Sequence, residues 1–80
     1  MNESTKELCL LLLFLTGWEE ESNKTPGKKI FKSFKVFSGD ILDLLENEDL
    51  IIRHWNVQSI ILTDEGKARA KKLKKKYTDL

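Results

Sequence analysis

The chain has 80 residues, of which 40% are hydrophobic and 34% are charged, and its formal net charge is +1. This length and composition fit one small folded domain, expected to span residues 1–80, and they exclude an intrinsically disordered chain. The single cysteine excludes an internal disulfide. Because a core this small supplies little net stability, association with a second chain is one expected source of more.

The N-terminal segment predicts a helix that begins at a capping box, in which Ser4 caps the backbone and Glu7 reaches back to it. Every position from 8 to 15 is apolar, so this helix is expected to be buried on most sides or shared between two subunits. We expect Gly17 to end it. The apolar run is too short to span a bilayer, and the acidic residues before it are unlike a signal peptide. We therefore expect a cytoplasmic protein that does not enter a membrane.

The next two segments have weaker patterns. Residues 18–27 are polar and contain a Thr-Pro-Gly breaker, so we predict an exposed loop that is flexible over 19–29. In residues 28–37, lysines alternate only in part with apolar residues, which is compatible with either a helix or a strand. The apolar spacing favours a short helix that passes into an extended link.

The remaining segments have clearer patterns. Residues 39–48 predict a helix that is capped by Ser38 and has one apolar and one acidic face. Residues 50–52 and 59–62 are rich in β-branched side chains and flank a polar turn, which predicts an antiparallel hairpin. Thr63 is a good N-cap and is followed by two acids, so we expect the last helix to begin there.

The resulting order is helix, loop, short element, helix, hairpin and helix. This is an α+β fold of winged-helix-like type, mainly helical with one β-hairpin. Four segments resemble a bacterial family of small winged-helix-like proteins of unknown function: the leucine-rich first helix, FKSF at 31–34, DILDLLENEDLI at 40–51 and SIILTDEGKARAKKL at 59–73. The resemblance supplies no catalytic residue, and this chain departs from the family in having Asp49 where a Gly would close the helix.

Residues that carry enzymatic chemistry are scarce. One histidine and one cysteine cannot form a usual zinc site, and the spacing of Cys9 and His54 matches no ligand motif. Cys9 lies in the apolar run and is interpreted as a core residue. The glycines form no phosphate-binding loop. We therefore expect no catalytic, metal-binding or cofactor-binding residues and no small-molecule substrate.

Nucleic-acid binding is the function that the fold suggests. In a winged helix the helix before the hairpin enters the major groove, but here residues 39–48 carry four acids and no base, which disfavours groove binding. An alternative mode uses the lysine segment and the hairpin tip, with an aromatic side chain stacking on a base or sugar. Its residues are Lys24, Lys28, Lys29, Lys32, Lys35, Arg53 and Trp55. The competing interpretation is that the lysine segment pairs with the acidic helix that follows it.

Protein interaction is the third class of function. The last helix places an apolar stripe among lysines, and such a stripe can continue into a partner helix. The stripe consists of Ala70, Leu73, Tyr77 and Leu80. The sequence therefore predicts a non-enzymatic module that binds a protein partner or forms a homodimer, and the alternative is a DNA-binding protein similar to transcriptional regulators.

Overall fold

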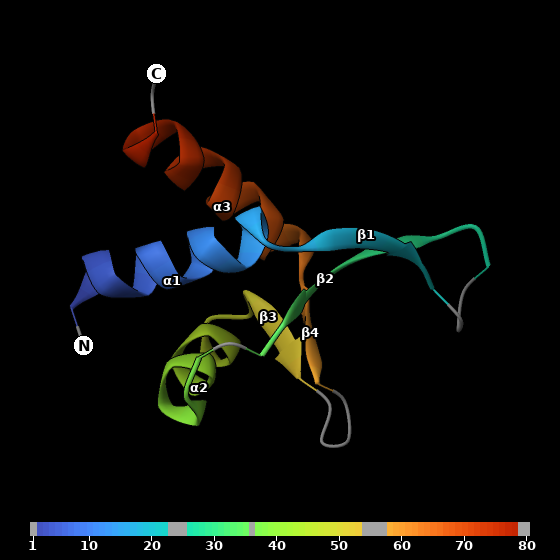
Figure 1. The fold of residues 1–80 in the computed structure, drawn as a ribbon, viewed down its shortest axis with the longest axis horizontal. Helices are drawn as coiled ribbons and strands as arrows, with labels where there is room; N and C mark the ends of the chain where they lie inside the picture. The colour runs from blue at the N-terminus through green and yellow to red at the C-terminus, as the bar shows by residue number, and fades with distance from the viewer. Residues whose placement is uncertain (1, 23–25, 36, 54–57, 79–80) are drawn as a thin grey trace.

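The computed structural model describes residues 2–22, 26–35, 37–53 and 58–78. Helices lie on one side of a four-stranded antiparallel sheet, and the first two strands extend beyond them as a hairpin (Figure 1). The sheet order is β1-β2-β4-β3. In chain order the elements are α1 (Glu3–Leu15), β1 (Trp18–Glu21), β2 (Lys29–Phe34), α2 (Gly39–Asn47), β3 (Ile51–Arg53), β4 (Ser59–Leu62) and α3 (Asp64–Tyr77). The α+β class is confirmed.

Two segments that were not predicted to be strands form strands in the structure. Part of the predicted loop forms β1, and the segment for which a short helix was favoured forms β2, with Trp18 opposite Lys32. On its other side β2 pairs with β4, where Ser33 lies opposite Ile60. Because β2 gains hydrogen-bonded partners on both sides, these pairings outweigh the local helix-like spacing of its apolar residues. The predicted flexible loop over 19–29 is therefore wrong for both strands, and residues 23–25 lie outside the described residues.

The start of α1 also differs from the prediction. Asn2, and not Ser4, is the N-cap, because its side-chain oxygen accepts a hydrogen bond of 2.8 Å from the backbone N–H of Thr5. The helix ends at Leu15, just before Gly17, as expected. A Cβ atom at Gly17 would overlap the Phe31 ring and the Lys32 carbonyl oxygen, so glycine permits the close approach of the chain to β2.

The elements from α2 onward lie where they were predicted. Ser38 occupies the N-cap position of α2, but its side chain makes no capping hydrogen bond, unlike the prediction. Asp49, after α2, has a φ of 59°, the left-handed conformation that a Gly usually adopts at this place. The Thr63 hydroxyl accepts a hydrogen bond from the Gly66 N–H at 2.9 Å and donates one to the Asp49 carbonyl at 2.6 Å. Thr63 thus joins the end of α2 to the start of α3. The predicted two-stranded wing is one half of a larger, four-stranded sheet.

The core lies between the helices and one face of the sheet. Leu13, Leu45 and Ile60 have no exposed surface, and Phe31 of β2 stacks on Phe14 of α1 with 5.2 Å between ring centroids. The buried hydrophobic cluster consists of Leu10, Leu11, Leu13, Leu42, Leu45, Leu50, Ile51, Ile60, Leu62, Ala70 and Leu73. One face of the sheet is therefore covered, and the other carries the candidate site.

Candidate functional site: the outer sheet face

The face of the sheet that points away from the helices is defined by the strand register. Successive side chains in a strand alternate between the two faces, and Ser33 and Ile60 point into the core. Their neighbours Lys32 and Ile61 therefore point outward, and the register extends this row across all four strands. We call the outward side chains the outer sheet face: Trp18, Glu20, Ile30, Lys32, Phe34, Ile52, Ser59 and Ile61.

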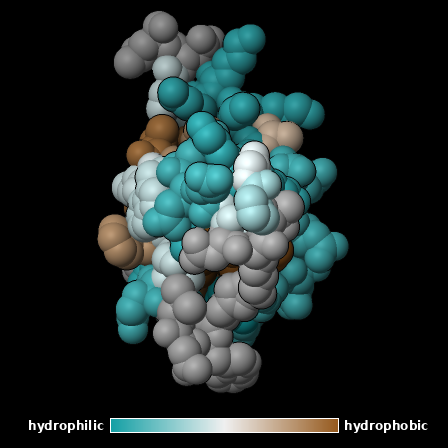
Figure 2. Space-filling model, turned by 90° about the vertical axis from the view of Figure 1, so that its right-hand side faces the viewer, coloured by the Kyte–Doolittle hydropathy of each residue, from teal (hydrophilic) through white to brown (hydrophobic). Residues whose placement is uncertain are grey.

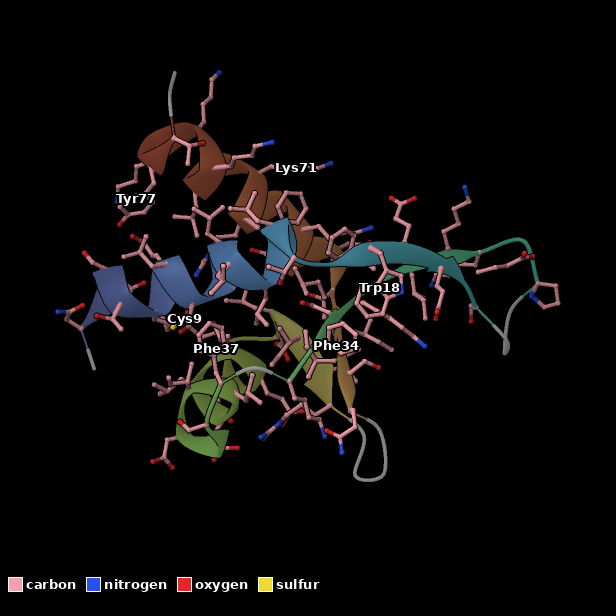
Figure 3. All side chains as sticks on the ribbon, in the orientation of Figure 1. Cys9, Trp18, Phe34, Phe37, Lys71 and Tyr77 are labelled. Carbon is pink, nitrogen blue, oxygen red and sulfur yellow. The ribbon has the colours of Figure 1, made fainter. Side chains whose placement is uncertain are left out.

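Apolar side chains on the outer sheet face are unusually accessible. Phe34 is 58% exposed and Ile52 is 44% exposed. The rings of Trp18 and Phe34 contact each other, with centroids 4.9 Å apart and a tilt of 53°, and Figure 3 shows them near the base of the β1–β2 hairpin. Hydrophilic side chains cover most of the described surface seen from the hairpin end (Figure 2). Phe34 and Ile52 are therefore exposed apolar side chains on a largely polar molecule.

The lysine on the outer sheet face is neutralised by the neighbouring strand. Lys32 Nζ lies 2.7 Å from a carboxylate oxygen of Glu20, and this lysine's hydrogen bond lowers the pKa of the Glu20 carboxyl. The lysine segment was expected to pair with the acidic helix after it. Lys32 instead pairs with the acidic strand before it, because β1 and β2 are adjacent antiparallel strands.

The charge of Arg53 is taken up by α2. Its guanidinium donates hydrogen bonds to Glu46 at 2.8 and 3.2 Å and also to Asp43, and its backbone N–H donates to Glu46 at 3.2 Å. Arg53 lies on the inner face of β3, on the side of Ile51, which directs it toward α2. The predicted contact residue is therefore an internal ion-pair partner of the acidic helix.

The other predicted basic residues are spread along the β1–β2 hairpin. Lys28 and Lys29 are exposed, and Lys35 is half-buried after the end of β2. Lys24 and Trp55 lie outside the described residues. The structure thus brings together no group of described, unpaired cations comparable to the patch that the nucleic-acid alternative required.

The predicted interaction stripe on α3 faces the chain's own core. Ala70 and Leu73 are buried, and Tyr77 is half-buried with its hydroxyl donating to Glu7 of α1 at 2.8 Å. Leu80 lies outside the described residues. Because α1 of the same chain occupies this stripe, Ala70 and Leu73 are not available to a second chain in this structure.

Side chains that could hold a metal ion are not grouped in the described part of the chain. Across residues 2–22, 26–35, 37–53 and 58–78, no three His, Cys, Asp or Glu side chains are grouped so as to hold a metal ion. Cys9 is buried, as expected of a core residue, and burial raises the pKa of its thiol. No described helix has the length and apolar character needed to cross a membrane.

A family model described as a domain of unknown function, DUF6429, matches residues 1–80. The chain belongs to the DUF6429 family. No curated protein and no solved structure matches the chain. The family match agrees with the resemblance to a domain of unknown function and assigns no activity to the chain.

The outer sheet face was not predicted from the sequence because its residues come from four separate strands. Trp18 belonged to the predicted loop, and Phe34 was interpreted as part of a short helix. A period-two interpretation of residues 30–34 places Ile30, Lys32 and Phe34 on one face of a strand, but both faces mix apolar and polar side chains, so the signal is weak. It becomes convincing only when the neighbouring strands are known.

The Arg53 ion pairs predict how the stability of this DUF6429 domain depends on pH. Hydrogen bonds from the Arg53 side chain hold the pKa of Glu46 below its usual value. A carboxyl whose pKa is lower in the folded state than in the unfolded state stabilises the fold at pH values above its unfolded-state pKa of about 4.3. This stabilisation is lost as the pH falls through the folded-state pKa. We expect the urea midpoint to fall below about pH 4.3, and Glu46→Gln to reduce the slope.

The control for this prediction is a double-mutant cycle. Arg53→Leu should reduce the same slope, and adding Glu46→Gln to it should change little further. Because the Glu46 side chain is partly exposed, the effect should be modest. A full wild-type slope in both single variants would contradict the assignment.

Proposed function

We propose that this DUF6429 domain is a non-enzymatic protein-interaction module that binds its partner through the outer sheet face. The observation that carries the proposal is that Phe34 and Ile52 are exposed on a face where Trp18 contacts Phe34 and the lysine is already neutralised by Glu20. Exposed apolar side chains that cluster on a polar surface are typical of protein contact sites. The C-terminal half has the order helix, hairpin and helix that is typical of a winged helix. We propose that the domain is related to winged-helix proteins.

The sheet edges support binding through the face. β1 forms one edge and carries three consecutive glutamates, which oppose the addition of another strand. β3 forms the other edge and is short, and its Arg53 N–H is bonded to Glu46 of α2. A partner that adds a strand is therefore disfavoured at both edges, whereas the outer sheet face stays open to a packed contact.

Nucleic-acid binding is the second candidate. One observation favours it: Trp18 and Phe34 lie on the face of an antiparallel sheet. In proteins that bind single-stranded nucleic acid, aromatic side chains in this position stack on bases. Against it, Lys32 and Arg53 are paired with carboxylates, so they offer little charge to phosphates. Three glutamates of β1 would also repel a phosphate backbone.

The two candidates are separated by photo-crosslinking in extracts of cells that produce the domain. A photoreactive phenylalanine analogue at position 34 is expected to give a discrete adduct that nuclease treatment does not change and whose added mass is that of a protein. The adduct should be lost when Ile52→Lys places a charge on the same face. The same analogue at Lys72, on the exposed side of α3, is the control and should not give this adduct.

The outcome at position 34 decides between the candidates. A nuclease-sensitive adduct would favour the second candidate. No adduct at position 34, or an equal adduct at position 72, would remove the outer sheet face as the binding surface.

A further inference from the structure

A second exposed apolar surface lies on α1, away from the outer sheet face. Leu8, Leu12 and Leu15 are 48%, 44% and 50% exposed, although neighbouring leucines of the same helix are fully buried. Their spacing of four and then three residues places them in one row, the spacing of helices that pack against each other in coiled coils. We call this row the α1 leucine stripe. No described element of the chain covers it.

The position of α3 beside the α1 leucine stripe follows from its ion pairs. On α1, Lys6 lies on the side opposite to the stripe and pairs with Glu48, which follows α2. Glu48 also binds Arg69 of α3 at 3.3 Å. The Arg69 flank of α3 therefore lies on the Lys6 side of α1. The other flank of α3 lies on the side of the leucine stripe.

That second flank is basic. Helical spacing places Lys67, Lys71 and Lys74 on it, three and four residues apart, whereas Arg69 and Lys76 are on the first flank. Lys71 and Lys74 are exposed, and in the described part of the chain no carboxylate lies within ion-pair distance of either. Lys71 projects into solvent beside the antiparallel α1 and α3 helices (Figure 3). The surface thus combines an apolar row with an adjoining row of positive charge.

Charge argues against an antiparallel pairing of two copies of the chain through this stripe. Two α1 helices that pack antiparallel around a two-fold axis bring both α3 helices to the same side of the interface. The Lys71 and Lys74 flanks would then face each other, which is unfavourable for like charges. The complementary occupant has apolar side chains for the stripe and negative charge for the α3 flank.

We propose that the α1 leucine stripe, with Lys71 and Lys74, binds an amphipathic helix of a partner protein whose apolar face is flanked by acidic residues. Its apolar face packs on Leu8, Leu12 and Leu15, and its acidic flank lies along α3. This is the helix-in-groove type of recognition, with charge setting the orientation. It does not depend on the outer sheet face and would give the domain a second binding surface.

The test is fluorescence anisotropy with the intact domain and a labelled synthetic peptide of about 18 residues, five helical turns. The acidic probe carries Leu at heptad positions and Glu beside them. The comparison probe carries Lys in place of Glu. We expect the acidic probe to bind saturably and at least about tenfold more tightly than the basic one at moderate salt.

Matched variants locate the contact. Leu12→Ser should weaken binding by about tenfold or more, because a buried leucine contact is lost. Lys74→Glu should weaken it by about threefold to tenfold. Lys72→Glu makes the same charge change on the same helix but away from the stripe, and should change binding less than about twofold. Circular dichroism of each variant checks that it is folded.

Each contrary outcome overturns the proposal. These outcomes are no saturable binding of the acidic probe, equal binding of the basic probe, or equal effects of Lys74→Glu and Lys72→Glu. Binding to vesicles of anionic phospholipid that depends on Leu12 and Lys74, without binding of the acidic peptide, would assign the surface to a membrane and would also overturn it.

Discussion

Replacing Leu45 with alanine is expected to lower the free energy of unfolding by about 2–5 kcal/mol. Leu45 has no exposed surface and lies where α2 meets the rest of the core cluster, so the substitution removes buried contacts and leaves a cavity. The free energy of unfolding of a chain this long is expected to be about 4–12 kcal/mol in total. Loss of this one side chain should therefore remove a large part of it. Urea denaturation followed by circular dichroism measures the change.

The adjacent residue provides the control. Leu44 is 39% exposed on the same helix, and Leu44→Ala removes the same atoms without creating a core cavity. We expect a change below about 1 kcal/mol for it. If both variants were destabilised equally, the assigned burial of Leu45 in the core would be incorrect.

Gly66→Ala is expected to destabilise the domain by about 1–3 kcal/mol, although alanine is the better helix former by about 1 kcal/mol. A Cβ atom at Gly66 would overlap the carbonyl oxygen of Leu50, which is backbone and cannot rotate away. The first turn of α3 would have to move away from the Leu50 backbone, which follows α2. The same denaturation experiment reports the loss.

Gly39→Ala is the matched comparison, because Gly39 also lies in the first turn of a helix but a Cβ atom there would meet no other atom within 4 Å. We expect this variant to be unchanged or to gain up to about 1 kcal/mol. A gain in both variants would show that α3 and Leu50 are less closely packed than the overlap at Gly66 requires.

The parts of the fold that were predicted correctly are those with local signals. The α2 helix has an apolar face and a start at Ser38, and α3 has Thr63 as its N-cap with acids in its first turn. These signals act over one or two helical turns, so they can be read in order along the chain. The hairpin strands around residues 54–57 were also predictable, because β-branched runs flanked a polar turn.

The strands β1 and β2 lacked such signals. Three consecutive glutamates do not favour a strand, and β2 mixes lysines with aromatic residues. Their structure depends on pairing, since β2 lies between β1 and β4 and its Ser33 is buried against Thr16, with 3.3 Å between hydroxyl oxygens. A partner that is distant in sequence is invisible to a local pattern.

For the candidate surfaces, charged residues could be identified from the sequence, but their ion-pair partners could not. Arg53 was identified as a possible contact residue, yet packing of α2 against β3 places it between Asp43 and Glu46. The sequence shows that the leucines of α1 occupy more of the helix surface than a single apolar face. Which of these leucines is exposed depends on where α2 and α3 pack.

The sequence by itself therefore determined the family, the α2, hairpin and α3 elements, and the alternating blocks of charge. Only the tertiary structure decided that the segment before α2 is a pair of strands, that Lys32 and Arg53 are paired with carboxylates, and which apolar side chains are exposed. The physical reason is range. Capping and periodicity act between residues a few positions apart, whereas strand pairing, ion pairing and burial join residues that the fold brings together.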